Sequence, residues 1–426
     1  MQGQAPTLII ICIGLLLADI YITNGLREGF KKWRFIQAKS FLVLYWVFSL
    51  LLVAGVIASV FLKFNLGFKG AVLLLFFLTL FCKVCFLPFL LVDDIRRLSL
   101  WWAHKRHKPE PEFPASQPKP DNITRSEFLL KAGLIAGSLP LAGLTYGIVN
   151  GVYNYQVKRR TLYLPHLPKA FDGIKLGQLS DIHSGSFYNK KAVLGGVEML
   201  LGEKPDFIFF TGDLVNTVSS EMRNYQDIFA KVKAPLGVYS SLGNHDYGDY
   251  KDWPSLAAKQ KNFNDLLVTH KNMGWDLLRN ENRRLKVDGE EIGILGVENW
   301  GALSRFPKYG KLDEALKNTD DLPVKLLLSH DPSHWRAQVL PHYPQVDVMF
   351  SGHTHGMQFG VQTEHFQWSP IQFVYKEWAG LYHEGNQQLY VNVGYGFLGY
   401  PGRVGILPEI TIFELKAGPD PQQHKS

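Results

Sequence analysis

The chain has 426 residues, 46% of them hydrophobic and 19% charged, and its formal net charge is +7. This length allows two or three domains. The surplus of Lys and Arg is weak evidence for nucleic-acid binding, because membrane proteins gather basic residues in their cytoplasmic loops, and we predict no nucleic-acid partner. All three cysteines lie in apolar runs near the N-terminus (Cys12, Cys82 and Cys85), which excludes a disulfide or a thiolate metal ligand in the rest of the chain.

Four long apolar segments occupy the first third of the chain. They cover residues 7–22, 41–62, 70–92 and 132–150, and a helix needs about 20 apolar residues to cross a bilayer. We therefore predict a multi-pass membrane protein. Its parts are three transmembrane helices with a basic first loop (1–92), a basic, Pro-rich cytoplasmic linker (93–131) and a fourth transmembrane helix (132–150).

The basic residues of the loops predict an orientation in the cell membrane. Residues 27–39 and 96–125 are rich in Lys and Arg, whereas the loop between the second and third segments has little beyond Lys63 and Lys69. Basic loops stay in the cytoplasm, so the N-terminus and everything after about residue 151 are predicted to be extracytoplasmic. The basic run 158–160 opposes this orientation, because it would lie outside.

Three further features of this region leave alternatives open. Residues 123–137 resemble a twin-arginine export signal, with one Arg (Arg125) where two are usual. Asp19 and Lys83 lie within apolar segments, where a charge serves transport or sensing, pairs with another charge, or reaches the interface; pairing or reaching the interface is favoured. Cys82 and Cys85 have the spacing of a redox motif, but helix packing is the better interpretation.

After residue 160, apolar runs alternate with helical stretches such as 191–204 and 220–232. This alternation predicts an α/β sheet, in which ligands bind beyond the carboxyl ends of the strands. Polar side chains follow five of the predicted strands: Asp181 and His183; Asp213; Asn244, His245 and Asp246; His330; His353 and His355. Such density at strand ends favours a metal or catalytic site over solvated loops.

The ordered blocks D-x-H, G-D, G-N-H-D, a lone H and G-H-x-H resemble the calcineurin-like metallophosphoesterases, and the resemblance covers about residues 160–416. The ending "GYGFLGYPGRVGILPEITIFEL" (394–415) is similar to the bacterial transmembrane branch, which includes enzymes similar to UDP-2,3-diacylglucosamine pyrophosphohydrolase. Met357 stands where that branch often has a second glycine. The resemblance implies an α/β fold over residues 151–416, a β-sandwich flanked by helices (α/β/β/α), preceded by the four transmembrane helices and followed by a polar tail (417–426).

The resemblance also implies roles for these residues. It makes Asp213 the ligand that bridges two divalent metal ions (Mn, Fe, Zn or Mg). Asp181, His183 and His355 join it on one ion, and Asn244, His330 and His353 on the other. His245 becomes the catalytic group that either hydrogen-bonds the phosphoryl oxygen or protonates the leaving oxygen, and Asp246, also assigned to catalysis, is expected to orient it and raise its pKa.

Two features bear on the substrate. Arg403 is a candidate for binding a substrate phosphate, because guanidinium groups suit phosphate, although a structural role is equally compatible with its sequence. The aromatic stretch 366–382 is expected either to touch the membrane interface or an acyl chain, or to belong to the core. The remaining histidines (His166, His270, His334, His342, His365 and His383) are expected to be surface or packing residues.

The sequence thus predicts a membrane-anchored, metal-dependent phosphoesterase that hydrolyses a phosphoester or pyrophosphate bond with a metal-activated hydroxide. Its predicted partners are a phosphoester substrate, which the resemblance makes a candidate for lipid linkage and lipid metabolism, and membrane lipids. The alternatives are a tethered phosphodiesterase or protein phosphatase for soluble substrates, and a non-catalytic sensor or transporter.

Overall fold

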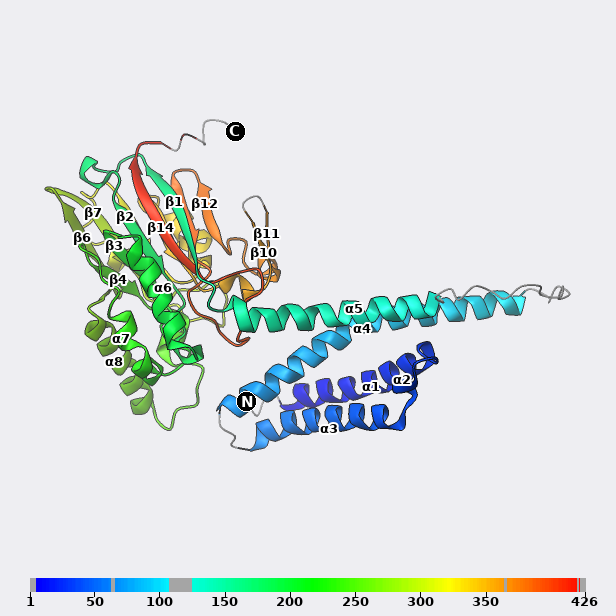
Figure 1. The fold of residues 1–426 in the computed structure, drawn as a ribbon. Helices are drawn as coiled ribbons and strands as arrows, with labels where there is room; N and C mark the ends of the chain where they lie inside the picture. Colours follow the sequence, from blue (N-terminus) through cyan, green and yellow to red (C-terminus); the bar gives the residue numbers. More distant parts are fainter. Residues whose placement is uncertain (1–4, 63–65, 107–124, 364–365, 420, 422–426) are drawn as a thin grey trace. The chain divides into compact units, whose positions relative to one another are not determined.

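The computed structural model describes residues 5–62, 66–106, 125–363, 366–419 and 421. The chain divides into two compact units, Met1–Thr145 and Tyr146–Ser426 (Figure 1). Residues 107–124 of the expected Pro-rich linker (93–131) lie outside the described residues.

The first unit is helical. Its helices are α1 (Ala5–Gly29), α2 (Arg34–Gln37), α3 (Lys39–Phe61), α4 (Leu66–Arg106) and α5 (Arg125–Tyr146). Among the described residues, four helical segments are long and apolar enough to cross a membrane, namely Thr7–Gly29, Lys39–Ser59, Lys69–Ala103 and Ser126–Gly151. The four predicted spans therefore correspond to helices, although the first, third and fourth are longer than expected.

The predicted linker 93–131 begins too early, because α4 continues through it to Arg106. Asp93 forms ion pairs with Arg96 and Arg97, three and four residues further along the chain. Pairs at these spacings stabilise a helix, so the charges that we interpreted as the end of a span instead extend the helix.

The two charges within the apolar segments pair with each other. Lys83 Nζ lies 2.5 Å from Asp19 Oδ1, and both side chains are buried within the unit. Tyr45 donates a hydrogen bond of 2.6 Å to the same carboxylate. The predicted pairing of these two charges is confirmed, and it offsets the cost of placing charge in apolar surroundings.

The second unit contains two six-stranded sheets and a small hairpin. The first sheet has the order β1 (Gln156–Leu164), β14 (Glu409–Ala417), β2 (Lys175–Leu179), β3 (Phe207–Thr211), β4 (Val238–Ser241) and β5 (Asp276–Leu277). The second sheet has the order β12 (Gly380–Glu384), β13 (Gln387–Val391), β9 (Val348–Ser351), β8 (Lys325–Leu328), β7 (Glu290–Gly296) and β6 (Glu281–Val287). The hairpin pairs β10 (Val361–Gln362) with β11 (Gln367–Trp368).

The helices of this unit are short, apart from two. They are α6 (Lys190–Gly202), α7 (Gln226–Phe229), α8 (Leu256–Met273), α9 (Leu312–Ala315) and α10 (Leu340–His342). The predicted helix at 191–204 is confirmed as α6. The stretch 220–232 instead divides into a 3₁₀ turn, η5 (Ser219–Asn224), and α7.

Alternation along β3 shows how the layers form. Phe207 and Phe209 pack between the two sheets, while Ile208 and Phe210 pack against the helical layer of α6, α7 and α8. Successive side chains of a strand point to opposite faces, so a strand buried on both faces reads as a continuous apolar run. The outer face of the second sheet packs against the π-helical turn η7 (Trp335–Val339), through Trp335 and Val339. The predicted α/β/β/α sandwich is confirmed.

Strand direction determines where polar residues meet. β2, β3 and β4 run parallel in the first sheet, and β7, β8, β9 and β13 run parallel in the second. The loops that follow β2, β3, β4, β8 and β9 carry the predicted site residues. The carboxyl ends of these parallel strands therefore bring the site residues to one region of the sandwich.

Candidate metal centre

The loops that carry the candidate ligands have an unusual backbone. Asp181, His183, Asp213, His353 and His355 all have positive φ, between 48° and 73°. Left-handed backbone costs a residue with a Cβ about 1–2 kcal/mol. Such conformations persist where surrounding structure fixes them, and they gather at functional sites.

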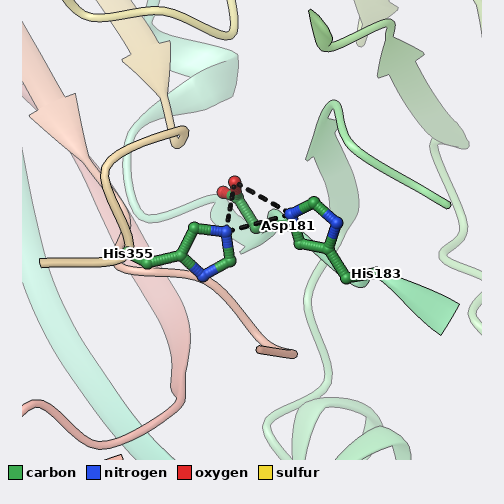
Figure 2. A group of neighbouring side chains, drawn as sticks. All are labelled: Asp181, His183 and His355. Carbon is green, nitrogen blue, oxygen red and sulfur yellow. Dashed lines mark hydrogen bonds and ion pairs between the residues drawn. The ribbon is translucent and has the colours of Figure 1, made fainter. Parts of the chain in front are cut away.

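One group of candidate ligands contains Asp181, His183 and His355, all buried (Figure 2). His355 Nε2 lies 3.2 Å from Asp181 Oδ1 and 3.0 Å from His183 Nε2. Gly352 is required here, because a Cβ at this position would lie 2.1 Å from Asp181 Oδ2. The three donor atoms converge as the ligands of one ion would.

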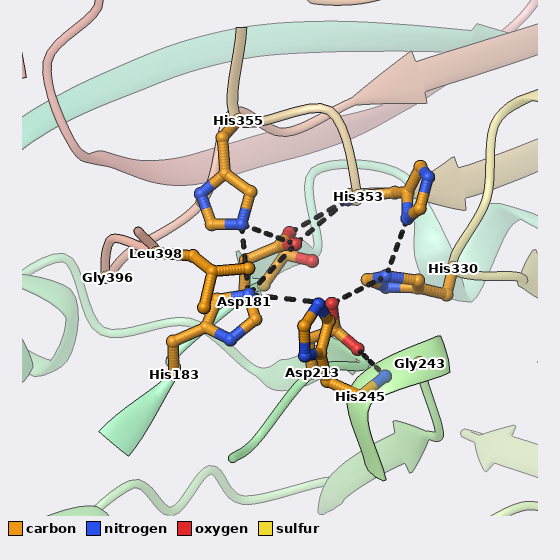
Figure 3. A network of polar contacts seen from close by, with 12 residues as sticks. Asp181, His183, Asp213, Gly243, His245, His330, His353, His355, Gly396 and Leu398 are labelled. Atoms are coloured by element: carbon orange, nitrogen blue, oxygen red, sulfur yellow. Dashed lines mark hydrogen bonds and ion pairs between the residues drawn. The ribbon is translucent and has the colours of Figure 1, made fainter. Parts of the chain in front are cut away.

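The second group contains Asp213, His330 and His353 (Figure 3). Asp213 Oδ2 lies 3.1 Å from His330 Nε2 and 3.5 Å from His183 Nε2 of the first group. His353 Nδ1 lies 3.3 Å from His330 Nε2. Asp213 therefore stands between the two groups, the position that a bridging carboxylate requires.

Asn244 tests whether a metal fits this arrangement. The residue is 2% exposed, and its Oδ1 has no hydrogen-bond partner among the described residues, while its Nδ2 donates to Tyr250 Oη at 2.7 Å. A buried carbonyl oxygen without a partner costs free energy, and a cation would remove that cost. The donor set of His, Asp and Asn without thiolate suits Mn, Fe, Zn or Mg.

Neighbouring groups orient the imidazole rings. The carbonyl of Thr211 lies 2.7 Å from His330 Nδ1, which leaves His330 Nε2 to face Asp213. Tyr375 Oη lies 2.9 Å from His353 Nε2 and donates to Asp331. Such outer contacts fix the ring that a ligating histidine presents. The roles of Tyr375 and Asp331 were not predicted from the sequence, although Asp331 directly follows the predicted ligand His330.

Electrostatics keep the carboxylates ionised. Burial works to raise the pKa of Asp181, but His355 outweighs it and lowers that pKa. Burial likewise opposes the positive charge of His330, yet the Asp213 carboxylate raises the pKa of His330 to about 10. Burial lowers the pKa of His183 well below its ordinary value. The carboxylates of Asp181 and Asp213 therefore supply negative charge at the centre, which favours the binding of cations.

His245 lies beside the two groups and lines the cavity at the site. Its Nδ1 lies 2.6 Å from the carbonyl oxygen of Asn216, which orients the ring. The expectation that Asp246 orients His245 is wrong, because the Asp246 carboxylate accepts backbone N–H groups of Asp213, Leu214 and Gly243. Burial and the neighbouring Asp213 raise the pKa of Asp246 to about 7, while these donors favour its anion. Asp246 thus connects the loop that follows β3 with the loop that follows β4.

The expected contact between Arg403 and substrate is also corrected. Arg403 is fully buried, and its guanidinium donates to the carbonyl oxygens of Val393 and Gly396. Burial lowers the pKa of Arg403 to about 10, so the group stays cationic at neutral pH. A guanidinium enclosed by main-chain carbonyls supports loops and does not face substrate.

A cavity of about 330 Å³ opens over both groups. Besides candidate ligands and His245, its lining includes Tyr250, Arg305, Phe306, Ile371 and Leu398. Arg305 is exposed and supplies the cationic side chain that our sequence analysis sought in Arg403. No sequence signal singles out Arg305, since it lies in a loop without a motif.

Two family models match the chain. The model of the calcineurin-like phosphoesterase domain matches residues 174–357, and that of the calcineurin-like phosphoesterase transmembrane domain matches residues 5–152. The metallophosphoesterase YkuE of Bacillus subtilis is 30% identical over 69% of this chain and 98% of its own length. The chain belongs to the calcineurin-like metallophosphoesterases, which are metal-dependent phosphoester hydrolases, and to their membrane-associated members.

Other relatives extend beyond the matched region. A zebrafish (Danio rerio) transmembrane protein with a metallophosphoesterase domain is 29% identical over 64% of this chain, and the match spans 60% of the zebrafish protein. Among solved structures, the NAD nucleotidase of Haemophilus influenzae matches 52% of this chain and 45% of its own at 16% identity, with a TM-score of 0.37. That score is low, so the fold assignment rests on the family models.

Proposed function

We propose that this chain is a membrane-anchored phosphoesterase that uses two divalent ions to hydrolyse a phosphoester or pyrophosphate bond. The observation that carries the proposal is the position of Asp213 Oδ2, close to histidine nitrogens of both ligand groups. When bound, two such ions neutralise phosphoryl oxygens and acidify water. Their ligands would be Asp181, His183, His355 and Asp213 for one ion, and Asp213, Asn244, His330 and His353 for the other.

Other side chains at the cavity have proposed roles in proton donation, in phosphate binding and in the orientation of a ligand. His245 is held by Asn216 at Nδ1, so its Nε2 is available to donate a proton to the leaving oxygen. Arg305, at the cavity wall, is placed to pair with a substrate phosphate. Tyr375 and Asp331 hold His353 in its ligating orientation.

We propose further that the substrate is amphiphilic and linked to a lipid. The aromatic stretch 366–382 divides into two parts: Tyr375 and Trp378 are buried in the core, whereas Phe366 and Phe373 are 59% and 80% exposed. Ile371, close to Phe373 in the chain, lines the cavity. The exposed aromatic side chains in the segment that also contributes Ile371 to the cavity, together with the four candidate spans, favour a substrate held at the membrane over one that diffuses in solution.

We propose that the chain is a multi-pass membrane protein whose catalytic unit lies outside the cytoplasm. The basic loops predicted from the sequence support this orientation. Arg96 and Arg97, which we counted with the third loop, lie instead near the C-terminal end of α4, where they pair with Asp93. The proposed orientation places this end of the helix on the cytoplasmic side.

Metal analysis combined with substitution tests the proposed mechanism. Full-length protein in detergent should bind two divalent ions, and Asp213→Asn should lose an ion and hydrolysis while staying folded. His353→Ala should do the same, because it also removes a proposed ligand. His342→Ala, at an exposed histidine, is the matched control. Activity of either ligand variant within tenfold of the parent would contradict the two-ion proposal.

Matched long- and short-chain phosphoesters test the proposed substrate class. Each buried methylene contributes about 0.8 kcal/mol, so four or five buried carbons should raise kcat/KM by roughly a hundredfold or more. Phe373→Ser should reduce this preference. Equal efficiency for both chain lengths, with Phe373→Ser silent, would favour a tethered enzyme for soluble phosphoesters.

A further inference from the structure

The fourth candidate span ends in a π-helical turn, η2 (Gly147–Gly151), which belongs to the catalytic unit. The carbonyl oxygen of Gly147 accepts a hydrogen bond of 3.1 Å from the backbone N–H of Arg403. A Cβ at Gly151 would lie 2.0 Å from the Arg403 carbonyl oxygen, and one at Gly147 would lie 2.9 Å from it. The turn therefore lies against the Arg403 backbone at a distance that glycine permits and other residues do not.

The side chain of the same residue reaches one of the two ligand groups. Arg403 Nη2 donates to the carbonyls of Val393 and Gly394 at 2.8 and 3.1 Å and lies 3.2 Å from His355 Nδ1. Its Nε donates to the carbonyl of Gly396 at 2.9 Å, and the Gly396 N–H donates to the Asp181 carbonyl at 2.8 Å. Arg403 thus supports both His355 and the loop behind Asp181.

The backbone next to Arg403 holds the loop that follows His355. Val404 N–H donates to the Gln358 carbonyl at 2.8 Å, and Gly360 N–H donates to the Val404 carbonyl at 2.9 Å. The Arg403–Val404 segment therefore lies between the end of the span and the His355 loop. Movement of η2 would move this segment, and with it the ring of His355.

We propose that η2 is a structural part of the metal centre and that Arg403 is a positioning residue, which couples the end of the fourth span to the Asp181–His183–His355 group. The inference rests on the proposed two-ion function. In the second group, the rings of His330 and His353 receive their supporting contacts from Thr211, Tyr375 and Asp331, although the His353 N–H also donates to the Asp181 carboxylate. Displacement of η2 should therefore weaken the first ion selectively.

Glycine substitutions in the full-length protein in detergent provide the test. Gly151→Ala places a Cβ against the Arg403 carbonyl, whereas the Cβ of Gly143→Ala, eight residues earlier in the same helical segment, meets nothing within 4 Å in the described part of the chain. Arg403→Lys removes the branched donor group but keeps the charge. His355→Ala gives the reference for loss of the first ion. Each variant is titrated with Mn²⁺, and electron paramagnetic resonance distinguishes a spin-coupled pair of ions from a single ion.

In the parent and in Gly143→Ala, we expect two ions and a coupled signal. Gly151→Ala and Arg403→Lys should weaken one ion by tenfold or more, keep the other, and yield the single-ion signal seen in His355→Ala. Unfolding in chelator shows whether the metal-free fold is intact. Two ions of parental affinity in both variants, or equal weakening of both ions, would overturn the inference. A parent that binds fewer than two ions would instead overturn the proposed function.

Discussion

Arg305 is the residue through which the cavity would recognise a phosphate. It is exposed at the cavity wall, and a fixed cation there adds binding energy to a substrate anion before and during reaction. We expect Arg305→Gln to raise KM by about tenfold with little change in kcat. The reason is that a contact between this charge and the phosphate would stabilise the bound substrate and the transition state equally. Steady-state kinetics measure both constants.

Arg223, in a 3₁₀ turn outside the cavity lining, offers the matched control for this charge change. Arg223→Gln should leave both constants unchanged. A fall in kcat of Arg305→Gln with constant KM would instead place Arg305 in transition-state stabilisation.

His245 offers a second prediction at the scale of single residues. His245→Ala should keep both ions and lower the rate by about 10²- to 10⁴-fold, the range for loss of general acid catalysis. The loss should shrink for nitrophenyl esters, whose leaving group needs no proton. Measuring both ester types together with metal content separates the roles, since metal lost with activity would make His245 a ligand.

The sequence identified site residues where a polar side chain directly follows a predicted strand. Asp181, Asp213 and His330 could be singled out because each directly follows an apolar run. Arg403 could not be assigned correctly, because its burial among carbonyls is a property of chain segments that meet only in the fold. Arg305 could not be found at all, because an arginine in a loop has no pattern until the cavity exists.

The loop after His355 shows how one element carries backbone strain. Met357 adopts φ 55° and ψ 14°, and its side chain is 56% exposed. Met357→Gly should stabilise the fold by up to about 1 kcal/mol, because glycine avoids the cost of left-handed backbone. Differential scanning fluorimetry should show a rise of a few degrees in Tm. Met357→Ala retains a Cβ and should show no rise, and a lowered Tm for Met357→Gly would contradict this account.

His270, in α8, predicts a pH dependence of folding. Burial lowers its pKa to about 3, against about 6.5 in an unfolded chain. The unfolded state therefore binds an additional proton as pH falls below about 6.5, so stability is full above that pH and declines below it by about 1.4 kcal/mol per pH unit. Denaturant unfolding in chelator between pH 7.5 and 4.5 measures the decline.

A matched pair of variants isolates this histidine. His270→Phe should reduce the slope of stability against pH by about 1.4 kcal/mol per unit, whereas His342→Phe, at an exposed site, should not. Identical slopes for His270→Phe and the parent would show that this histidine does not titrate on unfolding.

Elements were predictable where a pattern was continuous. The strands β3 and β9 follow from runs of buried apolar residues, since both faces of these strands pack in the core. The end of α4 was not predictable from hydropathy, because pairs of Asp93 with Arg96 and Arg97 extend a helix that the apolar pattern ends. The buried half of the aromatic stretch, Tyr375 and Trp378, could not be separated from its exposed half by composition.

The whole molecule leads to a prediction about topology. The basic loops predict that the catalytic unit faces away from the cytoplasm. A reporter that is active only outside should work when fused after Gly151 and fail when fused after Lys39. Activity of a cytoplasm-only reporter at the C-terminus would reverse the orientation and place the substrate at the inner leaflet, while the membrane attachment would remain.

The left-handed backbone at Asp181, His183, Asp213, His353 and His355 has a consequence for the molecule as a whole. At about 1–2 kcal/mol for each residue, these conformations together cost about as much as the net stability of an ordinary domain, about 5–15 kcal/mol. Packing and hydrogen bonding in the rest of the sandwich must offset this cost. A variant with glycine at these five positions would lose hydrolysis but avoid this cost, and its free energy of unfolding would rise. Stability and catalytic activity therefore make opposing demands on these five positions.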